Sequence, residues 1–230
     1  MNGVIYKKIK RVKKEIIEDF KEIPTTIASD AMNRTNAMRA SIKTLIENVH
    51  IVGSAITVKC MVGNNIMTHQ AIYLAEPGDV IVIDARGHVD TSVWGGIQTL
   101  ACKSRGISGV VIDGSVRDIQ DIRKLQYPVF CTGVVPAGPH KGWGDSINIP
   151  IQCGGVSVNP GDIIIGDDDG VVVIPRNEAE EVLKRAKERI EMEKKWIEGV
   201  KHGKTTLELM ELDKKIKELG VKIFEEEYEK

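Results

Sequence analysis

Short apolar runs alternate with amphipathic stretches along the chain as far as about residue 176. The apolar runs are rich in β-branched residues, which pack well on a pleated surface, and Gly, Pro and Asp bound them. Predicted strands occupy residues 53–62, 80–84, 110–112, 128–130, 133–135, 150–158 and 163–175. Predicted helices occupy residues 13–23, 25–32, 67–75, 91–105 and the stretch after Arg117. Helices between the early strands, and strand after strand later, predict a mixed α/β fold.

Turn chemistry supports these strands. Pro-Gly-Asp occurs at 77–79 and again at 160–162, each time directly before an apolar run. Pro presets φ and Gly supplies a positive φ, so each triplet predicts a tight entry into a strand. Asp167, Asp168 and Asp169 precede Gly170 between two apolar runs and predict a hairpin turn. They lack the spacing and the terminal Glu of a calcium-binding loop, so no calcium site is expected there.

The pattern changes at residue 177. Residues 178–199 are highly charged and carry one apolar stripe, which predicts an amphipathic helix with many i,i+4 ion pairs. A second helix is predicted over residues 205–229. The sequence therefore predicts an α/β domain over 1–176 and a helical extension over 177–230. The charges form a solvated face, and the stripe packs on the protein body or on a neighbouring subunit.

Composition excludes several classes of partner. The chain of 230 residues has 32 basic and 33 acidic side chains and only 4% aromatic residues, so neither a basic field nor stacking platforms for nucleic acid are expected. No apolar run reaches the length of a membrane span, and the first fourteen residues are too basic for a signal peptide. Four widely separated cysteines predict buried thiols. We therefore expect a cytoplasmic protein without a nucleic-acid or membrane partner.

The segment 110–118 is the most informative candidate for chemistry. A buried strand is predicted to end at Asp113-Gly114, with Ser115 capping a helix whose first turn carries Arg117 and Asp118. Small ligands gather at such strand ends in α/β sheets. Arginine matches a carboxylate or phosphate, and an aspartate oxygen suits a divalent metal. The alternative is an Arg–Asp pair on a solvated helix face, and this segment alone does not decide between the two.

A second candidate is a glycine-rich helix start formed by Gly95, Gly96, Ile97 and Gln98. Its backbone N–H groups are placed to bind an anion beside Arg117, although two glycines also suit close helix packing. His88, in the loop before this helix, is a candidate acid–base group or a polar surface residue. His69, with Asn64 and Asn65, occupies another strand-to-helix loop. His140 and Lys141 lie in a glycine-rich loop that resembles a lid.

Taken together, these motifs resemble those of the RraA-like family over roughly residues 23–175. The motifs that carry the resemblance are Trp94-Gly95-Gly96-Ile97, Lys103, Arg105-Gly106, Gly109-Val110-Val111-Ile112-Asp113-Gly114, Arg117-Asp118, Gly154-Gly155-Val156, Pro160-Gly161-Asp162 and residues 167–175. The family includes class II 4-hydroxy-4-methyl-2-oxoglutarate aldolases and a regulator that inhibits ribonuclease E. The resemblance implies a swivelling β/β/α domain that assembles as a homotrimer or hexamer with sites between subunits.

The resemblance also implies roles for the candidate residues. Arg117 would bind a substrate carboxylate or oxyanion, Asp118 would hold Mg²⁺ or Mn²⁺, and the amides of residues 95–98 would bind the carboxylate of pyruvate. A small 2-keto acid would then be cleaved, or oxaloacetate decarboxylated, through a metal-bound enolate. The protein would be a carbon–carbon lyase.

One departure from the family pattern concerns the proton donor. Characterised aldolases have an aspartate that is separated from the Arg–Asp pair by twenty residues. The corresponding position here is Gly96, which has no side chain to transfer a proton. Either His88, Asp90 or His69 supplies this group, or the substrate differs. A different class of function also stays open, a non-catalytic regulator of a ribonuclease or another protein. A methyltransferase is disfavoured, because no glycine-rich nucleotide loop follows an early strand.

Overall fold

The computed structural model describes residues 3–228, which fall into two compact units, Met1–Ala186 and Lys187–Lys230. The outer ends of the two predicted domains, residues 1–2 and 229–230, lie outside the described residues. Among residues 3–228, no helix combines the length and the apolar character needed to cross a membrane.

The first unit is built on one large mixed sheet with the strand order β1-β5-β4-β3-β2-β9-β10, and β6 pairs with β2. A separate hairpin is formed by β7 and β8. The strands are β1 Lys43–Thr44, β2 His50–Lys59, β3 Val80–Trp94, β4 Gly109–Val116, β5 Val129–Val134, β6 Ser146–Ile147, β7 Ile151–Cys153, β8 Val156–Val158, β9 Ile163–Asp167 and β10 Gly170–Ile174. Strands β2 to β5 run parallel, whereas β9 and β10 are antiparallel and enclose the predicted Asp-rich turn.

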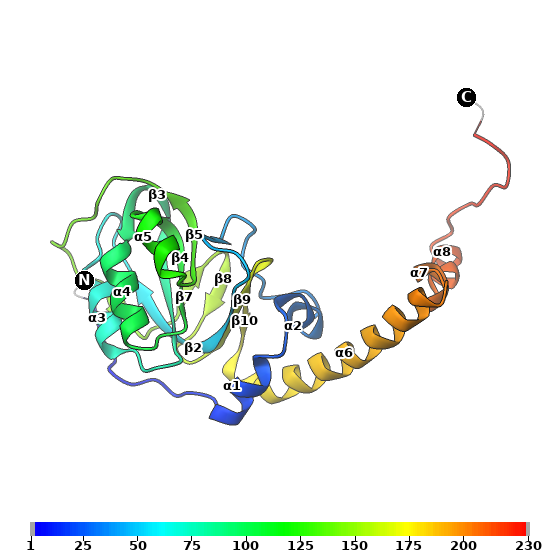
Figure 1. Cartoon of the computed structure of the whole chain (residues 1–230), viewed down its shortest axis with the longest axis horizontal. Helices are drawn as coiled ribbons and strands as arrows, with labels where there is room; N and C mark the ends of the chain where they lie inside the picture. The colour runs from blue at the N-terminus through cyan, green and yellow to red at the C-terminus, as the bar shows by residue number, and fades with distance from the viewer. Residues whose placement is uncertain (1–2, 229–230) are drawn as a thin grey trace. The chain divides into compact units, whose positions relative to one another are not determined.

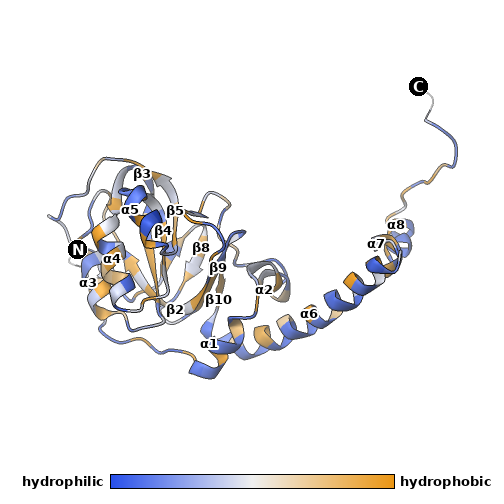
Figure 2. Ribbon diagram, in the orientation of Figure 1, coloured by the Kyte–Doolittle hydropathy of each residue, from blue (hydrophilic) through white to orange (hydrophobic). Residues whose placement is uncertain are grey.

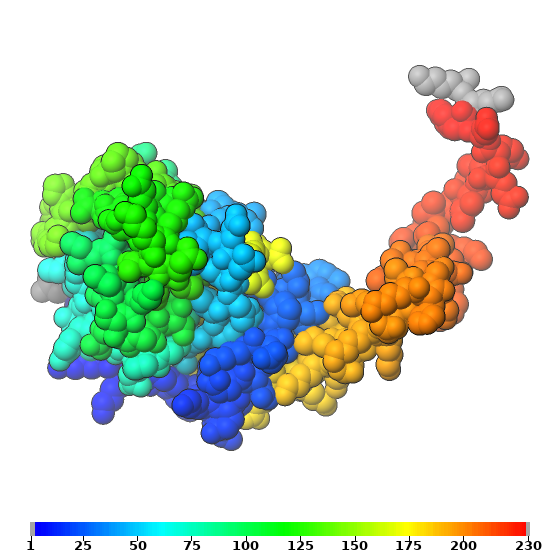
Figure 3. Space-filling model, viewed as in Figure 1, coloured from blue at the N-terminus to red at the C-terminus, as the bar shows by residue number. Residues whose placement is uncertain are grey.

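Helices connect the parallel strands and cover one face of the sheet (Figure 1). Helix α3 joins β2 to β3, α4 joins β3 to β4, and α5 joins β4 to β5. The helices of this unit are α1 Lys14–Phe20, α2 Thr25–Ala31, α3 Ile66–Leu74, α4 Gly96–Ser104, α5 Ile119–Leu125, the 3₁₀ turn η1 Arg176–Glu178 and the first part of α6 Ala179–Lys201. In the space-filling view the green residues of α4 and α5 form much of the near surface (Figure 3).

Alternate strand residues feed two cores, one on each side of the sheet. Ile81 and Ile83 point to the helices α3 to α5, whereas Val80 and Val82 point to the β7–β8 hairpin. This alternation follows from the pleat, which sends successive side chains to opposite faces. Helices, sheet and hairpin therefore form three layers, which confirms the predicted mixed α/β fold. The four cysteines are buried free thiols, and burial raises the pKa of Cys60 to about 12.

We expect replacement of Phe130 by alanine to lower the free energy of unfolding by about 3–5 kcal/mol. Its ring is fully buried in the core on the hairpin side, and Gly166 packs so closely that a Cβ there would lie 2.9 Å from the Phe130 ring. Chemical denaturation at fixed protein concentration measures the change. The control Tyr73→Ala removes a ring that is 71% exposed, and its effect should stay within about 0.5 kcal/mol. Equal losses in both variants would contradict the assignment of this core.

Two predictions around the central strands are wrong. Strand β3 continues to Trp94, so residues 85–94 are strand instead of loop and helix, and α4 begins only at Gly96. Register shifts let β3 continue, with Arg86 and Gly87 at positive φ between Asp84 and His88. Ser115 does not cap a helix: it is buried in β4 and donates a hydrogen bond to the Val89 carbonyl at 2.7 Å. Pairing between β3 and β4 overrides the local Asp-Gly signal.

The second unit contains the rest of α6, then α7 Thr206–Leu209 and α8 Leu212–Glu218. The predicted first helix of the extension is confirmed, and Figure 2 shows hydrophilic and apolar residues interspersed along it. The predicted helix over 205–229 is wrong: Glu211 adopts a left-handed conformation between α7 and α8, and residues 221–228 are not helical. Helices this short are marginal without packing partners. The absence of a side chain at Gly199 allows Leu209 of α7 to pack against it, because a Cβ there would lie 2.5 Å from a Leu209 methyl.

Candidate functional site

A cavity of about 160 Å³ opens where the β3–α4 and β4–α5 junctions meet the start of α3 and the loop 135–145. It is smaller than the ~300–1,000 Å³ typical of pockets for drug-sized ligands, so it suits a small metabolite. The residues that line it are Asn65, His69, Trp94, Gly95, Ile97, Gln98, Arg117, Asp118, Pro139 and Lys141. Most of them carry polar or charged groups, and they come from four separate segments of the chain.

Arg117 and Asp118 follow directly after β4. The Arg117 amide donates to the Trp94 carbonyl at 3.0 Å, which extends the pairing of β3 and β4 to the edge of the cavity. Asp118 then turns the chain with φ 58° and ψ 37°, and α5 begins at the next residue. Aspartate tolerates this left-handed conformation better than most residues do. The pair therefore precedes the helix, instead of occupying its first turn as predicted.

The Asp118 carboxylate is anchored through only one of its oxygens. Its Oδ2 accepts the Gly96 N–H at 3.2 Å and lies 3.6 Å from Arg117 Nε. Among the described residues Oδ1 has no hydrogen-bond partner, and the side chain is 39% exposed. A carboxylate with one fixed and one free oxygen fits a divalent metal such as Mg²⁺, which is often held by one or two carboxylates while water and substrate complete the shell. Within residues 3–228 no cluster of three or more metal-ligating side chains exists, so substrate and water would supply the other ligands.

The absence of side chains at Gly95 and Gly138 leaves room for Arg117 and Asp118. A Cβ at Gly95 would lie 2.6 Å from Asp118 Oδ2 and 3.3 Å from Arg117 Cγ. A Cβ at Gly138 would lie 2.6 Å from a terminal nitrogen of Arg117. The backbone of both segments therefore touches the Arg–Asp pair directly. Side chains at these positions would displace the two charged groups.

Buried amides form another part of the cavity wall. Gln98 donates to the Thr68 hydroxyl at 2.5 Å and accepts from Asn65 Nδ2 at 3.4 Å. Asn65 is 4% exposed, and its Oδ1 has no partner among the described residues. A buried carbonyl oxygen without a donor is costly, so a ligand or water hydrogen is expected to complete it. The Trp94 indole donates to the Thr99 hydroxyl at 2.9 Å, which holds the ring in the cavity wall.

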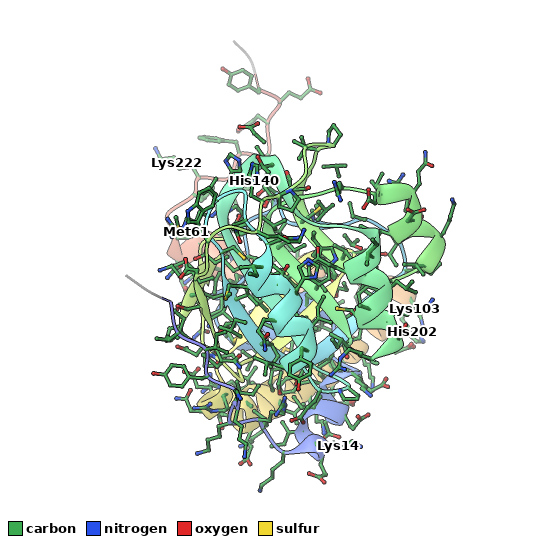
Figure 4. All side chains as sticks on the ribbon, turned by 90° about the vertical axis from the view of Figure 1, so that its left-hand side faces the viewer. Lys14, Met61, Lys103, His140, His202 and Lys222 are labelled. Atoms are coloured by element: carbon green, nitrogen blue, oxygen red, sulfur yellow. The ribbon has the colours of Figure 1, made fainter. Side chains whose placement is uncertain are left out.

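The loop 135–145 closes another side of the cavity. Its backbone is tied to the start of α3, because the Asn65 amide donates to the His140 carbonyl at 3.2 Å and the His140 amide donates to the Gly63 carbonyl at 2.7 Å. His140, labelled in Figure 4, packs its ring edge-on against Trp143. Lys141 brings a second cation to the cavity. Partial burial, and the positive charge of Lys141 after it, lower the pKa of His69 below the usual 6.5.

The structure brings most of the sequence-predicted residues together. Arg117, Asp118, Gly95, Ile97 and Gln98 line the cavity, and the Gly96 amide binds Asp118 from the first turn of α4. By contrast, His88 does not line the cavity.

His88 lies inside β3, opposite Gly114 of β4. Asp90 follows it in the same strand and is absent from the lining too. Sequence reasoning named Trp94 as part of a family motif but gave neither Trp94 nor Pro139 a place in the site, because an apolar ring at the end of a strand and a loop proline carry no signal of a site. It named His69 as a candidate for the proton-transfer group, and Asn65 and Lys141 only as members of nearby loops.

Comparison with known proteins identifies the family of this chain. The model of the RraA-like family, described as Aldolase/RraA, matches residues 25–173. A protein of Halalkalibacterium halodurans, provisionally named 4-hydroxy-4-methyl-2-oxoglutarate aldolase, is 44% identical over 76% of this chain and 83% of its own length. The uncharacterized protein MJ0644 of Methanocaldococcus jannaschii is 39% identical over 75% of this chain and 84% of its own length.

Solved structures agree with the family match. A Pseudomonas syringae protein of uncharacterized function superposes with a TM-score of 0.76 at 28% identity, covering 87% of this chain and 99% of its own. Streptomyces coelicolor RraAS2, described as an unusual member of the RNase ES inhibitor RraA protein family, superposes with a TM-score of 0.74 at 26% identity, over 81% and 98% of the two chains. The family match covers the β3–α4 and β4–α5 junctions that build the cavity, and the chain belongs to the RraA-like family.

Proposed function

We propose that this protein is a divalent-metal-dependent carbon–carbon lyase for small 2-keto acids. It would cleave a 4-hydroxy-2-oxoglutarate-type substrate, such as 4-hydroxy-4-methyl-2-oxoglutarate, to pyruvate, and would decarboxylate oxaloacetate. The observation that carries the proposal is the free Oδ1 of Asp118 beside the Arg117 guanidinium in a small polar cavity. The name of the Halalkalibacterium halodurans relative, at 44% identity, supports the same chemistry.

The charges of the cavity match a substrate with two carboxylates. Arg117 and Lys141 supply two cations from different segments, and a guanidinium binds a carboxylate through two parallel hydrogen bonds. The N–H groups of Ile97 and Gln98 lie in the first turn of α4, where amides have no acceptor within the helix and favour an anion. Gly96 has already given its N–H to Asp118, so Ile97 and Gln98 are the amides we assign to the substrate.

Cleavage of the substrate's carbon–carbon bond develops negative charge that Arg117 and the proposed metal at Asp118 can stabilise. When the C3–C4 bond of either substrate breaks, the electron pair moves toward the C2 oxygen of the pyruvate fragment. The Arg117 guanidinium stabilises this charge, and the absence of side chains at Gly95 and Gly138 leaves room for it. Asp118 would hold Mg²⁺ or Mn²⁺, which when bound polarises the keto group as a Lewis acid.

Pyruvate release from 4-hydroxy-4-methyl-2-oxoglutarate and from oxaloacetate tests the proposal. We expect both substrates to give pyruvate with Mg²⁺ or Mn²⁺, and chelation of the metal to abolish both reactions, because Asp118 is the one carboxylate among the described residues that line the cavity. A coupled lactate dehydrogenase assay measures the rates, with excess Mg²⁺ added back after chelation as the control. Turnover that persists undiminished in chelator would contradict the metal dependence.

A regulatory role is the competing function, and the description of RraAS2 as a ribonuclease inhibitor family member is what favours it. A folded protein that binds Mn²⁺ and yet releases no pyruvate from either substrate would support this second function. We also propose the homotrimer or hexamer and the cytoplasmic location that the family implies. Light scattering tests the assembly, and a monomer at micromolar concentration would contradict it.

A further inference from the structure

We infer that His69 is a catalytic base for aldol cleavage alone, where it accepts the proton of the substrate's C4 hydroxyl. This inference rests on the proposed function. Among the described residues that line the cavity, His69 is the one histidine, and it shares the cavity with Arg117 and Asp118. Aldol cleavage needs an acceptor for the hydroxyl proton, and histidine is the side chain most often used for such transfers near neutral pH.

The position of His69 on α3 presents a basic nitrogen to the cavity. It lies one helical turn after Asn65, and its Nε2 is 3.4 Å from Asn65 Nδ2. Asn65 Nδ2 can act in this contact only as a donor, so Nε2 accepts in the tautomer that carries its proton on Nδ1. At 3.4 Å the contact is long, and a substrate hydroxyl is a stronger partner that can replace it.

The surroundings keep the imidazole neutral. Partial burial is the main cause of its lowered pKa, and the positive charge of Lys141 adds to it. Arg117 and Asp118 are the other charged groups in the cavity lining, and they come from the β4–α5 junction. A neutral imidazole is the form that accepts a proton, and a lowered pKa preserves that form at weakly acidic pH.

His69 Nε2 takes the C4 hydroxyl proton, and the O–H electron pair becomes the second bond of a C4 carbonyl. The C3–C4 bond breaks, and its electron pair forms the enolate of pyruvate, which then takes a proton from water at C3. The imidazolium returns its proton to water, so no oxidant or further reactant is needed.

Oxaloacetate has no hydroxyl at C4, and its C3–C4 bond breaks with loss of CO₂. A base that acts on that hydroxyl is therefore unnecessary for decarboxylation, whereas Arg117 and Asp118 serve both reactions. This difference separates a catalytic role of His69 from a structural one, because a variant with a damaged cavity would lose both activities together.

The test compares His69→Gln with wild type on both substrates, at saturating Mg²⁺. We expect aldol cleavage of 4-hydroxy-4-methyl-2-oxoglutarate to fall about 10²- to 10⁴-fold in kcat, and oxaloacetate decarboxylation to stay within about twofold. Glutamine keeps a polar side chain that can contact Asn65. His50→Gln, a change at an exposed histidine at the start of β2, is the matched control. The acid limb of the cleavage profile should lie below pH 6.5 in wild type and vanish in His69→Gln.

Other outcomes overturn the inference. Equal loss of both reactions in His69→Gln would show that the residue has a structural role. Unchanged aldol cleavage in this variant would show that His69 takes no part in the reaction. If His88→Gln lost aldol cleavage while His69→Gln kept full activity, the catalytic base would be His88 of β3. If wild type releases no pyruvate from either substrate, the proposed function fails, and the inference fails with it before any variant is compared.

Discussion

Replacement of Asp118 by asparagine is expected to lower metal-dependent pyruvate release by at least about 10³-fold from both substrates, the equivalent of several kcal/mol of transition-state stabilisation. The change removes the negative charge that would hold the metal and keeps the size of the side chain. Asparagine also tolerates the φ of 58° at this position, and its amide oxygen can still accept the Gly96 N–H. The variant should therefore fold normally, so the loss is a direct measure of the charge.

Two further measurements separate the effect of Asp118 on metal binding from its effect on turnover. Electron paramagnetic resonance of Mn²⁺ should show weaker binding by Asp118→Asn without any reference to turnover. Asp121→Asn is the matched control, because Asp121 is an exposed carboxylate of the same turn that contacts Lys124 at 3.7 Å and does not line the cavity. It should bind Mn²⁺ as wild type does. Normal Mn²⁺ binding and turnover in Asp118→Asn would remove Asp118 from the metal site.

Addition of a single methyl group at Gly95 is expected to lower turnover about 10²-fold, the scale of loss that follows from displacing catalytic groups by about 1 Å. The new Cβ would lie 2.6 Å from Asp118 Oδ2, a separation that forces the carboxylate or the backbone to move. The backbone of Gly95 is extended, with φ −166°, so alanine can adopt it and the effect comes from the contact alone. Steady-state kinetics on both substrates measure it.

Gly142→Ala provides the control for Gly95→Ala. A Cβ at Gly142 meets no atom within 4 Å, although the residue belongs to the loop that carries Lys141. We expect its turnover and its melting temperature to match those of wild type. If Gly95→Ala keeps full activity, the contact of Gly95 with Asp118 does not position the carboxylate, and the assignment of the site's geometry is wrong.

Local patterns predicted the elements whose signals lie within one segment. Pro24 separates α1 from α2 as expected, and the two Pro-Gly-Asp turns precede β3 and β9. Residues 66–74 and 179–201 formed helices close to the predicted ranges. In each case the residues that set the backbone conformation are neighbours in sequence, so propensity, turn chemistry and apolar spacing agree.

The errors arose where a distant strand decides the conformation. Residues 85–94 contain Gly87 and charged side chains and read as a loop followed by the start of a helix, but β4 pairs with this stretch at His88, Ser92 and Trp94, and β3 continues through its bulges. Ser115 reads as a helix cap by local sequence, yet its hydroxyl bonds the Val89 carbonyl across the sheet. His88 was predicted to lie in a loop, but the pairing of β3 with β4 makes that segment a strand. The predicted loop before His69 is present and leads into α3.

The sequence by itself determined the fold class and the identity of the reactive pair, because strand propensity, turn residues and the order of motifs are local properties that a chain carries with it. Arg117 and Asp118 could be named without coordinates, and so could the glycine-rich start of α4. Only the tertiary structure decided which residues complete the cavity. Asn65 and His69 lie together at the start of α3, whereas Lys141 and the Arg117–Asp118 pair come from segments far from them in sequence. Parallel strand pairing, with the crossovers that it requires, brings these segments together at one edge of the sheet.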